Sequence, residues 1–231
     1  MATQTAISQA PLVKLESNKI HTFINPVKRI HTGQDVSTFL VSHAYRNIMQ
    51  FLLQLNRAVF PSIIRKPGSE HDATQIYQIG SSAVQFSEII LQLRKLVLTL
   101  GDIIDEVPLE SGPRRFGNLS FRKWSDLVES RSMSMLERYL PDQVREFNYE
   151  SKVDAVTELR GYFLGSFGSA QRLDYGTGHE LSFLAFLACI WKLGGYPASS
   201  SGQVEREIVL GVIEPYVFKL NNHCLTTDPT S

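Results

Sequence analysis

The run SFGSAQRLDYGTGHE, residues 166–180, gathers the residue types that bind phosphate into one short stretch. Gly176 and Gly178 flank Thr177 directly before an apolar segment that is expected to be helical. Glycines let a ligand approach bare backbone amides at the positive end of a helix dipole. Arg172 lies upstream, close enough to reach the same anion. The pattern indicates a phosphate site, although its spacing is neither the Walker pattern nor the dinucleotide fingerprint.

An ordinary helix start explains the same letters. Thr177 followed three residues later by Glu180 fits the capping box, in which Thr177 is the N-cap. The threonine hydroxyl would accept from a first-turn amide and Glu180 would bond back to the cap; losing such a cap typically costs about 1 kcal/mol. The two interpretations are compatible, because one helix start can be capped and still present amides to an anion.

Three neighbouring features have competing interpretations. Asp174 is either a magnesium ligand or, with better support, a partner for Arg172 or a turn-forming residue. His179, in the first helical turn, is more often a structural hydrogen-bonder than a general base. The other histidines and the two cysteines lack metal-ligand spacing, and neither Ser166 nor Ser169 lies in a nucleophile elbow, so no metal site is predicted.

A second cluster lies in the turn-rich loop 108–118 and is both basic and aromatic. Its members are Arg114, Arg115, Phe116, Gly117 and Asn118. A solvated loop whose Phe116 inserts into the core is slightly favoured over a binding role for this cluster.

Composition restricts the class of protein. The chain has 231 residues, 43% of them hydrophobic, and its 23 basic and 23 acidic residues leave no net charge. That balance argues against a nucleic-acid binder that relies on neutralising phosphates. No apolar run approaches a membrane span, and two cysteines suit a reducing compartment.

The elements that would position these residues are helical. The segment 179–193 is apolar on nearly every face and stops at Gly194-Gly195, which predicts a central, buried helix. Other helices are expected at 42–60, 76–107, 121–140, 142–149, 152–165 and from 204 to just before Pro215, with a loop at 65–75. No alternating strand pattern is evident, so the predicted fold class is all-α.

Three motifs together resemble the phosphotyrosyl phosphatase activator family. They are PVKRIH at 26–31, GPRRFGNLSFRKW at 112–124 and SFGSAQRLDYGTGHELSF at 166–183. The run RLDYGTGHE is highly specific to that family. The likeness extends from residue 26 to about 215, interrupted at 61–75, and is closer to the first of the two fungal-type paralogues.

The resemblance implies an all-helical core and lid flanking a cleft. It also implies activation of protein phosphatase 2A through its catalytic subunit, and peptidyl-prolyl cis-trans isomerase activity that depends on ATP and magnesium, in cytoplasm and nucleus. The motif residues that contact ATP correspond to Arg172, Thr177 and Gly178. The candidate cleft for a prolyl peptide comprises Arg114, Arg115, Phe116, Gly117, Asn118, Asp174, Tyr175, Gly176, His179 and Glu180.

The resemblance stops before the end of the chain. Family members continue into a tract that carries magnesium contacts and part of the peptide cleft, whereas this sequence continues as KLNNHCLTTDPTS. We therefore expect a mobile tail at 1–24, an activator domain at 25–218 that is incomplete at its C-terminus, and an unrelated polar tail at 219–231. The alternative functions are a phosphatase-binding module without catalysis, or an inactive truncated fragment with apolar core faces left uncovered.

Overall fold

The computed structural model describes residues 10–65, 72–80, 84–107, 120–172, 175–198 and 201–223, without the side chains of 64, 65, 72, 73 and 219–223. Its helices are α1 (Gly33–Leu40), α2 (His43–Ala58), α3 (Glu88–Asp105), α4 (Ser120–Tyr139), α5 (Asp142–Arg145), α6 (Ala155–Leu164), α7 (Thr177–Lys192), α8 (Gln203–Ile208), the π-helical η1 (Val209–Ile213) and α9 (Glu214–His223). Strands β1 (Ser62–Arg65) and β2 (Asp72–Gln75) complete the set. The all-α prediction is confirmed, because this hairpin is the sole sheet within the described residues.

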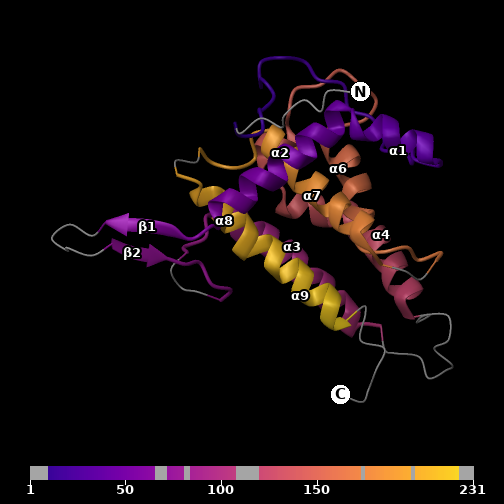
Figure 1. The fold of residues 1–231 in the computed structure, drawn as a ribbon. Helices are drawn as coiled ribbons and strands as arrows, with labels where there is room; N and C mark the ends of the chain where they lie inside the picture. The colour runs from indigo at the N-terminus through magenta and orange to yellow at the C-terminus, as the bar shows by residue number, and fades with distance from the viewer. Residues whose placement is uncertain are drawn as a thin grey trace.

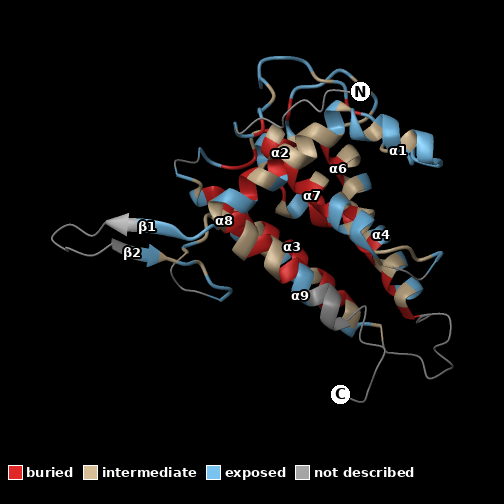
Figure 2. Ribbon diagram, viewed as in Figure 1, coloured by how far each residue is buried: buried red, intermediate tan, exposed pale blue. Residues whose placement is uncertain are grey.

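Helix α7 is the central element. It packs against α2 and α6, while α3 packs against α4 on one side and against η1 and α9 on another (Figure 1). The buried residues of α7 are Phe183, Leu184, Phe186, Leu187, Ala188, Ile190 and Trp191. Buried positions run along α7 and the facing sides of α3 and α4 (Figure 2). The predicted buried helix is therefore confirmed, except that Leu181 remains 37% exposed.

The end of α7 follows from its glycines. Gly194 adopts φ 77°. The amides of Gly194 and Gly195 donate to the carbonyls of Trp191 and Ile190, at 3.0 and 2.9 Å. These are the paired bonds of a Schellman motif, which closes a helix with a left-handed residue. A side chain at Gly195 would come within 2.6 Å of Val144, so this glycine also permits close packing of α5.

The N-terminal segment differs from the expected tail. Residues 10–24, called the N-terminal strap here, lie against the helices, with Leu12 and Phe23 3% and 4% exposed. The amide of Leu15 donates to the Lys192 carbonyl at 2.7 Å. The mobile-tail prediction is thus wrong for residues 10–24, because two apolar side chains and backbone hydrogen bonds anchor a mostly polar sequence.

Two other predicted boundaries were wrong. The helix expected over 76–107 begins at Glu88, and Gly80, at φ 74°, lies in a turn instead. The ends of the loop expected at 65–75 belong to two antiparallel strands, β1 and β2, in which Ser62 pairs with Gln75. This hairpin projects from the helical body (Figure 1).

The last helical segment continues through Pro215 to His223, past the expected stop and into the predicted polar tail. Pro215 has no amide to donate to Gly211, four residues earlier. The π-helical turn before it shifts the bonding pattern, since the amide of Glu214 donates to the carbonyl of Val209. Arg94 Nη1 approaches the Gly211 carbonyl at 3.5 Å.

Among the described residues, no helix combines the length and the hydropathy that crossing a bilayer requires.

Candidate functional site

The first turn of α7 differs from the predicted capping box. The helix begins at Thr177, so the N-cap is Gly176, whose carbonyl accepts from the His179 amide at 2.8 Å. Among the residues that the structure describes, no side chain caps this end. The capping prediction for Thr177 and Glu180 was therefore wrong: an extended Gly176, at φ −167°, starts the helix one residue earlier.

This helix start is open to solvent. Gly176, Thr177 and Gly178 are exposed, and a Cβ atom added at either glycine would meet nothing within 4 Å. Packing of the described residues therefore does not require either glycine. Uncapped amides at the first turn carry the positive end of the helix dipole, which favours a negatively charged group. The geometry suits an anion bound close to the backbone.

A tyrosine from α9 holds the segment that leads into this turn. Tyr216 is 2% exposed, and its hydroxyl donates to the backbone carbonyl of Ser166 at 2.6 Å. Since that donation uses its single proton, the hydroxyl accepts at 3.0 Å from Tyr175. The Tyr216 ring stacks on Phe183 with centroids 3.7 Å apart. Both ends of the motif are thus fixed to α9 and α7.

His179 provides a second anchor. Its Nδ1 lies 2.7 Å from the Gly165 carbonyl, which can only accept, so Nδ1 carries a proton and donates it to this carbonyl. The ring stacks beside Tyr175 at 5.6 Å. This hydrogen bond to the backbone fits the structural role that the sequence analysis favoured for His179 over a general base.

The start of α4 lies against the same segment. Arg122 Nε donates to the Ala170 carbonyl at 3.0 Å, and Nη2 reaches the Gln171 carbonyl at 3.5 Å. The ring of Trp124 meets Phe167 edge-on at 6.1 Å. Two motifs about 50 residues apart in sequence, 112–124 and 166–183, therefore come together in the fold.

Not every predicted site residue can be located. Arg172 is exposed and its amide donates to Ser169 Oγ at 3.1 Å. The predicted residues Asp174, Arg114, Arg115, Phe116, Gly117 and Asn118 lie outside the described residues. Sequence reasoning missed Tyr216 and Arg122. In a single sequence neither carries a signal, because a tyrosine after a proline and an arginine in a helix are ordinary.

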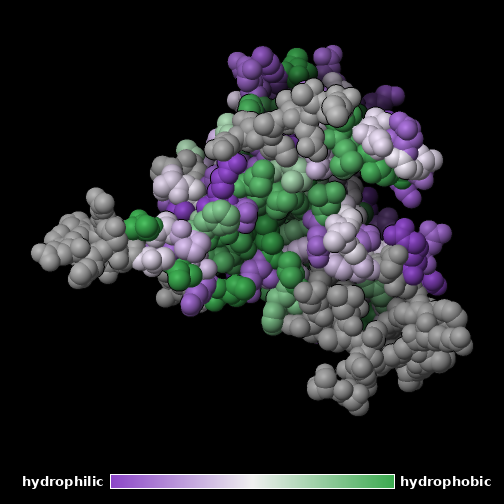
Figure 3. Space-filling view, in the orientation of Figure 1, coloured by the Kyte–Doolittle hydropathy of each residue, from purple (hydrophilic) through white to green (hydrophobic). Residues whose placement is uncertain are grey.

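An apolar cavity of about 340 Å³ opens beside the first turn of α7. Thr177 and Glu180 line it together with apolar residues of α2, α7, η1 and α9: Leu52, Leu181, Phe183, Leu184, Ile213, Tyr216 and Val217. We call it the α7-start cavity. Apolar atoms gather where these helices meet (Figure 3). A bound group could therefore contact the exposed amides and an apolar wall at once.

A magnesium site does not form among the described residues. They contain no group of three or more histidine, cysteine, aspartate or glutamate side chains that could hold a metal ion. The resemblance places the magnesium contacts in a tract that this sequence does not match, so the expected magnesium dependence stays a prediction.

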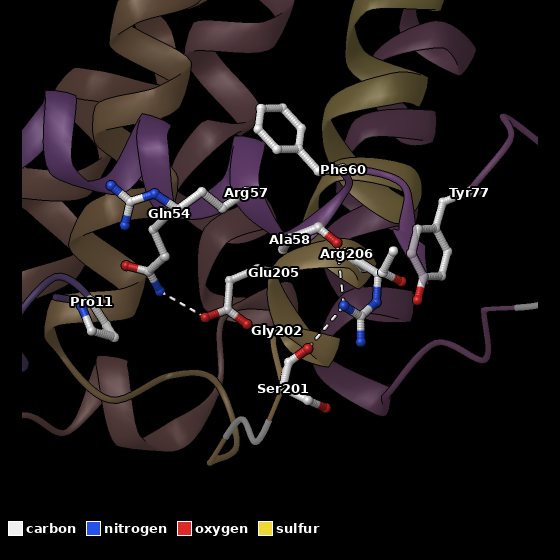
Figure 4. Close-up of a pocket in the computed structure, with 11 residues that line it drawn as sticks. Pro11, Gln54, Arg57, Ala58, Phe60, Tyr77, Ser201, Gly202, Glu205 and Arg206 are labelled. Atoms are coloured by element: carbon white, nitrogen blue, oxygen red, sulfur yellow. Dashed lines mark hydrogen bonds between the residues drawn. The ribbon is translucent and has the colours of Figure 1, made fainter. Parts of the chain in front are cut away.

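A larger cavity of about 680 Å³ lies between α2, α8 and the hairpin (Figure 4). Its polar groups are engaged in holding the fold. Gln54 Nε2 donates to the buried Glu205 at 2.9 Å, and Gln54 Oε1 accepts from the Leu12 amide at 2.8 Å. Arg206 donates to the carbonyls of Ala58 and Ser201. These contacts fasten the strap, α2 and α8 together.

Comparison with known proteins finds relatives over most of this chain. A family model described as "Phosphotyrosyl phosphate activator (PTPA) protein" matches residues 26–222. Proteins named "Serine/threonine-protein phosphatase 2A activator 1" from Aspergillus fumigatus and Emericella nidulans are 54% and 50% identical. The matches cover 85% and 89% of this chain but 41% and 47% of those proteins. The chain therefore spans less than half the length of these relatives.

A solved structure shares the fold. The crystal structure of the PP2A phosphatase activator Ypa1 (PTPA1) aligns with a TM-score of 0.67 and 28% sequence identity. The alignment covers 91% of this chain and 61% of that one. With the helical fold and the family match over most of its length, the chain belongs to the phosphotyrosyl phosphate activator (PTPA) family.

Proposed function

We propose that the chain binds ATP at the start of α7 and, in this form, activates protein phosphatase 2A. The observation that carries the proposal is the exposed turn at Gly176, Thr177 and Gly178, where the described residues neither cap the helix nor pack against the glycines. The names of the relatives supply the phosphatase as the partner. Because the chain matches less than half of each relative, phosphatase activation is a proposal for this chain.

The expected ATP residues have complementary roles. The amides of Thr177 and Gly178 would donate to phosphate oxygens, and a glycine at 178 leaves room for a close approach. Arg172 would add a charged, two-pronged donor. Tyr216, Tyr175 and His179 would position the turn, because the two tyrosine hydroxyls and Nδ1 of His179 already bond inside the protein.

We also propose that the α7-start cavity receives the prolyl ring of a phosphatase segment. Rotation about a prolyl amide is slow because resonance must be broken, with a barrier of about 18–20 kcal/mol. An apolar wall that removes water from the amide, with donors aimed at its twisted form, would favour the transition state. This reaction needs neither a nucleophile nor an acid–base pair. Leu181, Ile213 and Val217 supply the wall.

The experiment measures phosphatase pull-down, ATP-dependent phosphatase activation and prolyl-peptide isomerisation with one set of variants. Arg172→Ala should retain pull-down and lose ATP-dependent activation. Val217→Asp places a charge in the cavity wall and should lose isomerisation. Arg46→Ala, at a half-buried arginine on α2 outside the α7-start cavity, is the control and should match the unchanged chain in all three measurements.

The outcomes separate the functions. Pull-down without isomerisation or activation in the unchanged chain would indicate a binding module. Full activation by Arg172→Ala would contradict the proposed ATP site. Failure of the chain to melt cooperatively would indicate an inactive fragment. We propose, from the resemblance alone, that the chain acts in cytoplasm and nucleus, which imaging of a fluorescent fusion tests.

A further inference from the structure

A cavity at the opposite end of α7 is separate from the ATP site proposed above. It measures about 360 Å³ and lies between the N-terminal strap, α1, α2, α6 and α7. Lys192, the last residue of α7, lines it, whereas Thr177 begins that helix at the other end. We call it the strap cavity.

The walls of the strap cavity are largely apolar. They include Leu15 and Phe23 from the strap, Phe39 from α1, Ile48 from α2 and Leu159 from α6. Phe23 is fixed in place, since its ring packs edge-on against His21 at 4.7 Å and its amide donates to Ser151 Oγ at 3.2 Å. A volume and lining of this kind are typical of small-molecule sites, in which a few polar groups orient an apolar ligand.

The charged groups in the strap cavity are not equally engaged. Glu158 Oε2 accepts from the amide of Ile24 at 2.7 Å, so this carboxylate already fastens the strap. The ammonium group of Lys192 makes no hydrogen bond or ion pair with any residue that the structure describes, and the same holds for the hydroxyl of Tyr162 and the side-chain amide of Asn47. The groups left to a ligand are therefore mainly donors, and one of them is a cation.

The remaining groups do not suggest covalent chemistry. Burial, reinforced by the negative charge of Glu158, raises the pKa of the Cys189 thiol to about 12, although Lys192 opposes this shift. Burial likewise raises the pKa of Tyr162 to about 12. Both groups stay protonated at neutral pH, so Cys189 is a poor nucleophile and Tyr162 a neutral donor. The cavity is suited to binding without reaction.

We propose that the strap cavity binds a small aromatic or branched aliphatic carboxylate, with its apolar part among Phe23, Phe39 and Leu159 and its carboxylate on Lys192. Asn47 and Tyr162 supply further donors to the carboxylate. The ligand lies under the strap and does not contact the first turn of α7.

The first test uses the unchanged chain and two matched probes, 3-phenylpropionate and 3-phenylpropionamide, followed by ligand-observed NMR and calorimetry. The carboxylate should bind saturably in the millimolar range or tighter, and the amide about tenfold or more weakly, the effect of one charge-assisted hydrogen bond. Saturating ATP should leave carboxylate binding unchanged. Absence of saturable binding, or equal binding of the two probes, overturns the proposal.

The second test locates the site. Lys192→Met keeps the aliphatic stem and removes the charge, so it should weaken 3-phenylpropionate about tenfold and leave the amide unchanged. Lys95→Met, an exposed lysine on α3 away from this cavity, is the matched control and should bind as the unchanged chain does. Ala185→Phe fills the cavity and should abolish binding of both probes. Retained binding in Lys192→Met or Ala185→Phe overturns the assignment.

A third probe distinguishes the source of the carboxylate. A short peptide ending in phenylalanine with a free C-terminus is compared with its C-terminal amide. If the free peptide binds more tightly than 3-phenylpropionate and competes with it, the natural ligand is a chain terminus. If only 3-phenylpropionate binds, the ligand is a free small molecule. If the free peptide and 3-phenylpropionate both bind but do not compete, they do not share a site.

Discussion

The hydroxyl of Tyr216 donates to the carbonyl of Ser166 at 2.6 Å and accepts from Tyr175 at 3.0 Å. One buried side chain of α9 therefore fixes both sides of the segment between α6 and α7. Its ring also lies flat against Phe183, so apolar stacking and polar contacts act on the same residue. The start of α7 owes its position to a residue some 40 positions later in the chain.

Tyr216→Phe should loosen this segment while keeping the stack on Phe183. The Ser166 carbonyl loses its buried donor, so the free energy of unfolding should fall by about 1–3 kcal/mol. ATP affinity should fall as well, because the turn is less well positioned. Urea denaturation and calorimetry measure the two effects. Tyr149→Phe, at a 41% exposed position, is the control, and an equal loss in both variants would contradict the role of Tyr216.

Gly178→Ala separates folding from binding. A Cβ at position 178 meets nothing, and alanine restricts the unfolded chain more than glycine does, so stability should stay level or rise by up to about 1 kcal/mol. ATP binding should weaken because the methyl group hinders close approach to the amides. Thermal melting and calorimetry test both statements. Gly195→Ala should instead destabilise, since its Cβ would lie 2.6 Å from Val144; tolerance there would contradict the packing argument.

Alkaline pH should destabilise the fold through Cys189. Burial raises its pKa from the ordinary value of 9.0 to about 12. Below the lower value both the folded and the unfolded chain keep the proton, and the contribution to stability is complete. Between the two values the unfolded chain ionises first, so the free energy of unfolding falls as pH rises.

Cys189→Ala removes this contribution. The variant should be less stable than the unchanged chain at neutral pH, since it loses buried volume. The difference in free energy of unfolding between the two chains should shrink by at least about 1 kcal/mol near a pH of about 11. Urea titrations at the two pH values provide the measurement. A gap that stays constant with pH would show that Cys189 does not titrate as its burial requires.

The sequence predicted the elements that local chemistry determines. The end of α7 was foreseeable because Gly194-Gly195 satisfies the backbone bonds of a stopping motif, and its burial followed from apolar residues on every face. The residues around Arg172 and Thr177 marked the candidate site, because this stretch combines glycines, which make the backbone flexible, with a positively charged side chain. In these places a few neighbouring residues decide the structure.

Long-range contacts decided what the sequence could not. The strap lies against the helices because Leu12 and Phe23 are buried there, and this burial depends on residues far along the chain. The last helix passes Pro215 because a π-helical turn before it shifts the local hydrogen bonds. The N-cap is Gly176 and not Thr177, because Gly176 has an extended backbone and Thr177 is already helical. Residue types alone do not distinguish these two starting points.

Isothermal titration of ATP into the 231-residue chain tests the central claim most directly, with folding checked by cooperative melting. A nucleotide site at the start of α7 should give saturable ATP binding that weakens as salt is raised, is lost in Arg172→Ala and persists in Arg46→Ala. A folded chain that shows no saturable association, or equal affinity in Arg172→Ala, would rule out ATP binding at this helix start.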